Sequence, residues 1–398
     1  MLNAKPQNMI SDDELIIQGL LYEEYQAFDR SRVVFGKLYD NTGEKVYLFK
    51  EMTASLMSQT NILESIKRLQ NWDELHPDTL EVKRLLIPLY LTANYVVKAK
   101  TEAEYLLERS NAVLDLELAS NPFLYSGEFQ RALDLLARVY EQTSNESVLL
   151  RMAIIMDEYT DERKRAIQLL ETHRHMNIVD NSLYFKLLSL YIKENDVDGL
   201  LSIYKVLYED EKEDEYLYKI IDAYAYKRDA YGAIAFLEES GDGKHILYEL
   251  YKREKLFNKA LTLTDILYEE QKDAKWIAEK AVITFEKCED KNNKKMIDEV
   301  ILHFEKAIKM GIDDSMYLNY YGYTLIDKDI DISRGIEIIK SALVQQPDNT
   351  YYLDSLAWGY YKEHQCDKAY NTMAIVVKEE GLSESEIIEH WNKIQKCK

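Results

Sequence analysis

Small side chains recur at a nearly fixed interval along the chain, and this interval constrains the fold more than any other feature. The segment 125–133 (YSGEFQRAL) has the pattern of a turn between two helices, with a small residue where the second helix meets the first. Steps between corresponding positions are 34, 34, 33, 34, 34, 33, 27, 40, 35 and 34 residues. These positions are Ser31, Ser65, Ala99, Ala132, Ala166, Leu200, Ala233, Ala260, Val300, Gly335 and Ala369. Such a sustained register predicts one helix-turn-helix unit stacked on itself.

Other positions agree with this register. Twelve residues before the marked position a small residue recurs at Gly19, Ser120 and Ala357, where the first helix of a unit packs closely on the second. With its 34-residue interval, the sequence resembles the tetratricopeptide repeat family over about residues 12–380, as a bacterial multi-repeat protein. The resemblance implies an all-α, right-handed superhelical solenoid of about eleven helix-turn-helix units with a C-terminal capping helix.

Breaks in the register divide the chain. The 27-residue step between Ala233 and Ala260, interrupted by the glycine-containing segment 240–244, predicts a clipped unit that acts as a hinge. The predicted parts are a disordered polar N-terminus at 1–11, units one to seven at 12–240, units eight to eleven at 241–380, and a capping helix with a tail at 381–398.

The capping helix is predicted from a helix-start pattern and an apolar stripe. Residues 383–386 (SESE) resemble a capping box, in which a serine and a glutamate satisfy the first backbone amides. The stripe that should cover the exposed end of the repeat core consists of Ile387, Ile388, Trp391 and Ile394.

Composition excludes several classes. The chain has 398 residues, with 71 acidic and 50 basic side chains and a net charge of −21, which argues against a nucleic-acid partner. Its 13 glycines and 5 prolines are too few for the turns of sandwiches, barrels and dinucleotide-binding folds. No apolar run approaches the roughly 18 residues of a transmembrane span.

Catalytic motifs are absent from the sequence. It has no GxSxG, HExxH or GxGxxG, and segment 241–244 lacks the remaining elements of a Walker loop. Segment 327–331 (DKDID) resembles the opening of a calcium loop, but Ile332 and Ile338 stand where that loop needs Gly and Glu. We predict a protein that is not an enzyme, with no catalytic residue, no metal site and no cofactor.

Histidine and cysteine positions add little. His173 and His175 are two residues apart, so a helix would splay them, and we expect them at the surface or in a turn. Cys288, Cys366 and Cys397 are far apart with no CxxC, which argues against a disulfide framework and fits a reducing compartment or inert burial.

A partner-binding groove follows from the resemblance. In this family the first helices line a concave surface, and the corresponding positions here are rich in Tyr, Trp and charged side chains, which often dominate interfaces. The set that heat-shock co-chaperones use as a two-carboxylate clamp is not found. Packing between helices is the alternative role for each tyrosine. The predicted groove residues are Tyr226, Arg253, Asn319, Tyr323, Tyr351, Asp354, Trp358, Tyr361 and Lys362, densest in the last two units, and further lining positions include Asn121, Tyr125, Arg151, Tyr159, Lys193 and Tyr218.

The predicted function is a non-catalytic protein–protein interaction scaffold, an adaptor, chaperone-like or assembly factor that holds a peptide or helix of another protein. The first alternative is a lipoprotein that stabilises a bacterial envelope complex, such as a secretion or flagellar motor component, so that the partner would be a membrane protein complex. The second is a peptide-sensing regulator. We expect a cytoplasmic protein, or a periplasmic or membrane-anchored lipoprotein if a leader peptide was removed before the polar segment 3–8.

Overall fold

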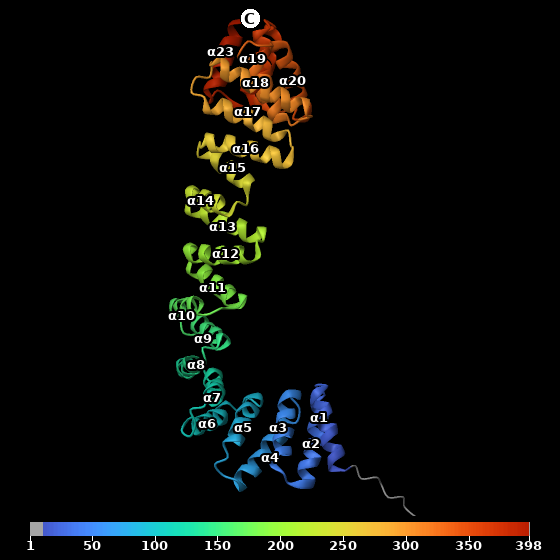
Figure 1. The fold of residues 1–398 in the computed structure, drawn as a ribbon, viewed down its shortest axis with the longest axis vertical. Coiled ribbons are helices and arrows are strands. Elements are labelled where there is room, and N and C mark those ends of the chain that lie inside the picture. Colours follow the sequence, from blue (N-terminus) through green and yellow to red (C-terminus); the bar gives the residue numbers. More distant parts are fainter. Residues whose placement is uncertain (1–10, 398) are drawn as a thin grey trace, which may run out of the picture. The chain divides into compact units, whose positions relative to one another are not determined.

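A computed structural model describes residues 11–397, and every regular element in that range is an α-helix (Figure 1). The predicted all-α class is therefore confirmed. The twenty-three helices form eleven consecutive pairs followed by a single last helix, α23, within the described range. The right-handed superhelical course remains a prediction.

In each pair the odd-numbered helix is the first helix and the even-numbered helix is the second. The first helices are α1 (Asp12–Glu24), α3 (Lys45–Ser58), α5 (Leu80–Thr92), α7 (Val113–Tyr125), α9 (Glu146–Glu158), α11 (Asn181–Glu194), α13 (Asp214–Lys227), α15 (Lys244–Arg253), α17 (Lys275–Lys287), α19 (Ser315–Asp327) and α21 (Thr350–Lys362). The second helices are α2 (Phe28–Thr42), α4 (Ile62–Leu75), α6 (Val96–Leu107), α8 (Phe129–Thr143), α10 (Arg163–Met176), α12 (Val197–Glu211), α14 (Ala230–Ser240), α16 (Phe257–Gln271), α18 (Lys294–Lys309), α20 (Ile332–Gln345) and α22 (Cys366–Glu380), and α23 spans Ser385–Cys397.

The recurrent small residues hold the two helices of a pair together. Every marked position lies on a second helix, and Ala132, for example, is fully buried. The helices α19 and α20 approach each other closely: a methyl group added to Gly335 would lie 2.7 Å from the carbonyl oxygen of Gly322. Backbone oxygens cannot move aside as side chains can, so these two glycines set the spacing of that pair.

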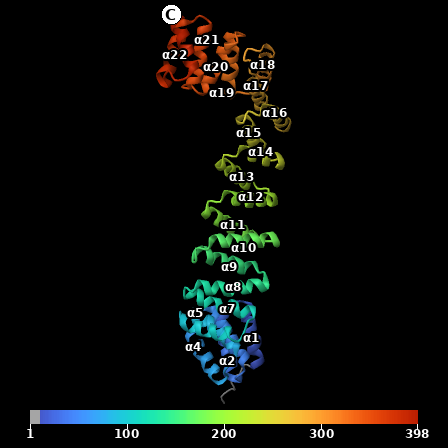
Figure 2. The same cartoon turned by 90° about the vertical axis from the view of Figure 1, so that its left-hand side faces the viewer.

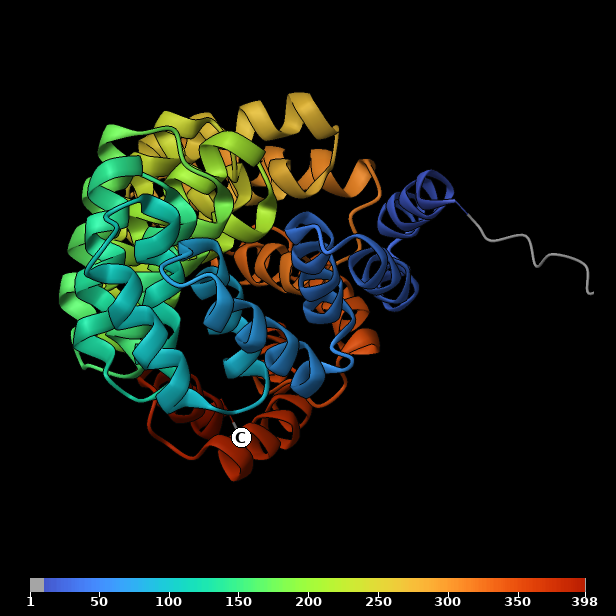
Figure 3. The same cartoon turned by 90° about the horizontal axis from the view of Figure 1, so that it is seen from below.

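The chain divides into two compact units, Met1–Leu207 and Tyr208–Lys398, with the boundary inside α12. Within each unit the pairs follow one another in chain order, as Figure 2 shows by labels and Figure 3 by colour. The boundary predicted at 240/241 and its hinge remain predictions. The helices that flank it, α14 and α15, have 11 and 10 residues, and Gly241 and Gly243 have positive φ. Residues 1–10 of the predicted polar N-terminus lie outside the described residues.

The last helix covers the end of the core, although with a different stripe from the one predicted. Ile387 and Ile394 of α23 are buried and pack with Ala357, Met373 and other residues of the last pair. Ile388 is 37% exposed, whereas the neighbouring His390 is only 3% exposed. Positions i, i+3, i+4 and i+7 share one face of a helix, so a stripe that begins at Ile387 includes 390 and excludes 388.

A disulfide joins the ends of the last two helices. Cys366 begins α22 and Cys397 ends α23, and their Cα atoms are 5.5 Å apart. The expectation that these thiols are unpaired is wrong, because the two helices run antiparallel and bring residues 31 positions apart into contact. The remaining thiol, Cys288, is half-buried.

None of the helices described in the structure is both long and apolar enough to span a bilayer.

Candidate protein-binding surfaces

Most of the predicted groove residues of the last two units lie against α23. Tyr323 donates a hydrogen bond to Glu386, and the Tyr351 hydroxyl lies 3.3 Å from Glu384 Oε1. Asp354, on α21, also accepts a hydrogen bond from His390 of α23. The structure therefore brings α19 and α21 together as predicted, but the chain's own last helix covers much of this surface.

The centre of the covered surface is a buried aromatic and ionic cluster. His390 Nδ1 lies 3.0 Å from each carboxylate oxygen of Asp354, and both residues are buried. The Trp358 ring stacks with two other rings: its centroid lies 4.2 Å from that of the His390 ring at an interplanar angle of 14°, and 4.9 Å from that of the Tyr361 ring at 16°. Sequence reasoning missed His390, although its position on the buried stripe of the last helix is the signal that could have revealed it.

Burial and charge shift the tyrosines on this surface. Burial raises the pKa of Tyr323, and its hydrogen bond to Glu386 raises it further. The charge of Glu384 and its hydrogen bond raise the pKa of Tyr351, which is 60% exposed. Both hydroxyls donate to carboxylates: Tyr323 of α19 to Glu386 of α23, and Tyr351 of α21 to Glu384, which immediately precedes α23.

Two buried polar atoms on these first helices have no hydrogen-bond partner among the described residues. They are Oδ1 of Asn319, on α19, and Nε1 of Trp358, on α21. A buried N–H or C=O without a partner is rare because its lost hydration is not replaced. Both residues were predicted groove positions.

Lys362, the last of the predicted residues on α21, pairs with Asp329 at 2.8 Å. The remaining two lie elsewhere in the second unit. Tyr226, on α13, is 76% exposed. Arg253, at the end of α15, lines a cavity of about 340 Å³ and pairs with Glu254 at 3.2 Å.

Exposed aromatic side chains concentrate on first helices in both units. Among the described residues, Tyr125 on α7 and Phe185 on α11 are 67% and 51% exposed in the first unit. In the second unit Tyr218 and Tyr226 are 57% and 76% exposed, and they lie eight residues apart on one face of α13. Sequence reasoning missed Phe185. Its helix carries several aromatic residues, and the repeat register alone does not show which of them is exposed.

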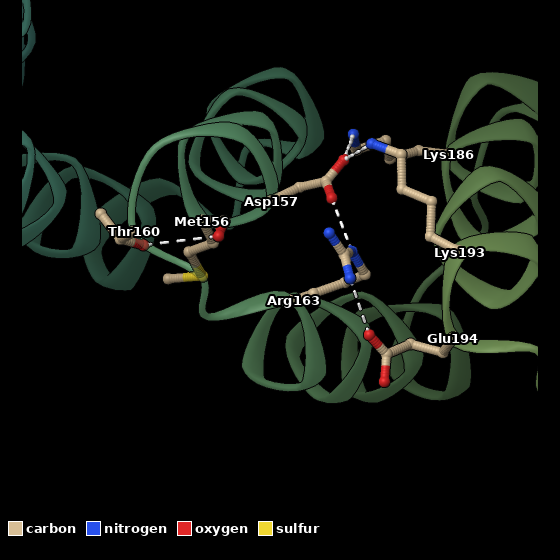
Figure 4. Close-up of polar contacts among 7 residues, drawn as sticks. All are labelled: Met156, Asp157, Thr160, Arg163, Lys186, Lys193 and Glu194. Atoms are coloured by element: carbon tan, nitrogen blue, oxygen red, sulfur yellow. Dashed lines mark hydrogen bonds and ion pairs between the residues drawn. The ribbon is translucent and has the colours of Figure 1, made fainter.

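An ionic network joins three helices of the first unit (Figure 4). The Asp157 side chain is fully buried and accepts from Arg163 at 2.8 Å, Lys186 at 3.0 Å and Lys193 at 2.7 Å. Burial alone would raise the pKa of Asp157, but these three hydrogen bonds outweigh it and hold the pKa well below its usual range. Arg163 also pairs with Glu194 at 2.9 Å. The network as a whole holds α9, α10 and α11 together, and Lys193, a predicted lining residue, serves mainly in this network.

A second buried network in the other unit has the same structural role. Glu279 of α17 accepts 2.6 Å hydrogen bonds from Tyr248 of α15 and Tyr317 of α19, and all three are buried. Burial, together with the charge of Glu279 and its hydrogen bond, raises the pKa of both tyrosines. Three consecutive first helices are thus fixed by one carboxylate.

The rejected metal candidates have other roles. In the calcium-like segment, Asp331 caps the N-terminus of α20 and Asp327 pairs with Lys328 at 2.9 Å. His173 is buried and bonds the Tyr140 hydroxyl at 2.7 Å, so its expected surface position is wrong: the residue faces the neighbouring second helix α8. The described part of the chain contains no cluster of three or more His, Cys, Asp or Glu that could hold a metal ion.

The class that these features define is an all-α array of tetratricopeptide-like helix pairs. No family model and no curated protein matches the chain. Matches among solved structures include a chain of the Naa15/Naa10–HypK complex, with 14% identity, a TM-score of 0.37 and coverage of 97% of this chain but 61% of that one. A chain of the Cut9–Hcn1 complex of the APC/C has 11% identity, a TM-score of 0.38 and coverage of 97% and 96%. The TPR domain of P58(IPK) has 14% identity, a TM-score of 0.24 and coverage of 97% and 98%.

Proposed function

We propose that this protein is a non-catalytic protein–protein interaction scaffold that binds a peptide or helix of another protein on its first-helix face. The observation that carries the proposal is the exposure of aromatic side chains on first helices, above all Tyr218 and Tyr226 on α13. Tyrosine combines a large apolar area with a polar end, so it is enriched where proteins bind one another. The exposure of these tyrosines to water has no role in the packing of the repeats.

The covered region supplies an internal example of such recognition. On α19 and α21, the same kind of side chain binds a helix, α23, through one tyrosine–glutamate hydrogen bond and one stacked tryptophan. A partner helix on the open part of the first-helix face would use the same chemistry.

Site-specific crosslinking tests this proposal. A photoreactive benzoylphenylalanine placed at Tyr226 should crosslink a partner in the cells that make the protein, and mass spectrometry identifies the product. Tyr231 is the matched control, because it is 63% exposed but lies on the second helix α14. Equal crosslinking from both positions would contradict binding on the first-helix face. If the probe gave no specific product at Tyr226 and none at Tyr125, the scaffold role would be contradicted.

One observation favours the alternative that the protein works outside the cytoplasm. Disulfides persist in oxidising compartments and are rare in cytosolic proteins, and the chain pairs Cys366 with Cys397. We therefore propose, as this alternative, that the protein works in an oxidising compartment. Mass spectrometry of protein alkylated before cell lysis should find the disulfide-linked peptides. Recovery of both cysteines alkylated would sink this proposal and favour the cytoplasmic adaptor.

A further inference from the structure

The helix that covers α19 and α21 is tied to the repeats at both of its ends. At its start a short connection, 381–384, joins α23 to α22, and at its end the disulfide joins Cys397 to Cys366, the first residue of α22. Gly381, which opens the connection, has a φ of 75°, and a methyl group added to it would find nothing within 4 Å beyond its chain neighbours. The connection is therefore unpacked at this point, and the disulfide is the covalent tie at the far end of α23.

Few side chains hold α23 against the repeats. Of its 13 residues, Ile387, His390 and Ile394 are the buried ones. An isolated helix of this length is marginally stable in water, so α23 depends on these contacts to stay folded. A disulfide that joins residues 31 positions apart shifts an opening equilibrium by about a hundredfold towards the closed state. The disulfide thus contributes much of what keeps α23 in place.

The disulfide can be reached by a reductant. Cys366 and Cys397 are both half-buried, and both line a surface pocket of about 670 Å³. A dithiol reductant attacks one cystine sulfur with a thiolate and forms a mixed disulfide, and its second thiol then closes the reductant's own disulfide. The cystine S–S bond breaks, and two electrons and two protons pass from the dithiol to the two cysteines, which leave as thiols.

Release of α23 would uncover side chains suited to binding another helix. Trp358 is 4% exposed and stacks on His390 of α23. Tyr323 donates a hydrogen bond to Glu386 of α23, and Asp354 accepts one from His390. Tryptophan and tyrosine are the residues that most often dominate protein interfaces. The face under α23 therefore has the chemistry of the open part of the first-helix face, but it is occupied.

We propose that the Cys366–Cys397 disulfide is a redox switch: its reduction frees α23 from the first-helix face of α19 and α21, which then binds an amphipathic helix of a partner in place of α23. The proposal rests on the scaffold role and adds the condition under which a second part of the face becomes available. The partner helix presents what α23 presents there, two aliphatic side chains at the positions of Ile387 and Ile394 and a ring at that of His390. These are positions i, i+3 and i+7, one face of a helix.

Hydrogen exchange of the full-length protein tests the first step. Amides of α23 should exchange about a hundredfold faster in dithiothreitol than in the oxidised protein, while those of α13 exchange equally in both. Cys366→Ser with Cys397→Ser should show the fast exchange without reductant. The matched control is Cys288→Ser, which removes the thiol outside the disulfide and should respond to dithiothreitol as the wild type does. Equal exchange of α23 in the oxidised and reduced protein would overturn the proposal.

A fluorescein-labelled peptide of residues 383–396 tests the second step, with fluorescence anisotropy as the readout. Its Kd should be lower by about tenfold or more for the reduced than for the oxidised protein, because the peptide must displace α23. The same peptide with Ile387→Ala and Ile394→Ala is the control; it leaves the protein's own folding untouched and should bind far more weakly. Equal affinity in both redox states, equal binding of the control peptide, or no binding to the reduced protein would each overturn the proposal. A dimer of the reduced protein in sedimentation would overturn it in favour of α23 exchange between two copies.

Failure here is distinguishable from failure of the scaffold role. If the Tyr226 crosslink forms while the peptide does not bind the reduced protein, the redox switch alone is wrong. If the peptide binds the reduced protein and no crosslink forms from Tyr226 or Tyr125, binding on the open first-helix face is wrong while the switch remains.

Discussion

The first-helix face of the second unit differs between α13 and the pair α19 and α21. On α13, Tyr218 and Tyr226 are exposed, whereas Trp358 on α21 is buried and Tyr323 on α19 is half-buried, because α23 packs over them. Both regions carry aromatic residues at positions that the repeat register assigned to the predicted groove. Residue type and register therefore do not decide whether a side chain binds a partner or stabilises the fold; what lies over the face decides it.

The largest expected effect tests this difference directly. Trp358→Ala should lower the free energy of unfolding of the C-terminal repeats by about 3–5 kcal/mol, because it leaves a cavity beside His390 and Tyr361. Tyr226→Ala, at a side chain that is 76% exposed, should change it by about 0.5 kcal/mol or less. Urea unfolding, monitored by hydrogen exchange of the C-terminal repeats, measures the change in free energy in both variants. Similar losses in the two variants would erase the distinction between a covered and an open face.

Two isoleucines of the covering helix sharpen the comparison. Ile394→Ala should cost about 2–4 kcal/mol, since Ile394 is fully buried against the last pair. Ile388→Ala should cost about 1 kcal/mol or less, because Ile388 is 37% exposed. The same unfolding experiment applies. If Ile388→Ala proved the more damaging, α23 would be rotated on its axis and His390 would not face Asp354.

The repeat register was sufficient to predict the helix pairs. Small residues such as Ala132 and Gly335 are required at this interval only where two paired helices pack closely. The structure places both residues at such contacts. A last helix over the end of the array was also predicted, from the helix-start pattern at 383–386 and the apolar stripe that follows it.

The arrangement of the site was less accessible from sequence. The predicted stripe was chosen by apolarity, so it included Ile388 and omitted His390. The burial of His390 depends on Asp354, which lies on another helix. The Cys366–Cys397 disulfide depends on the antiparallel packing of two helices and has no local signature. Interactions between distant residues thus determine which predicted groove positions are covered, and the repeat register does not contain them.

The smallest expected effect is a pH dependence of the covered side. Burial and the hydrogen bond to Glu386 raise the pKa of Tyr323 above its ordinary value near 10. The folded protein therefore holds this phenolic proton more tightly than the unfolded chain does. Its stabilising contribution is fully present below about pH 10 and is lost as the pH rises from there, by about 1.4 kcal/mol per pH unit. Tyr323→Phe has no proton to lose, so its C-terminal repeats should show a shallower loss of stability between about pH 10 and 11, measured by urea unfolding at each pH. Equal slopes in wild type and Tyr323→Phe would mean that α23 does not hold the Tyr323 hydroxyl, and the groove at α19 would then be as open as that at α13.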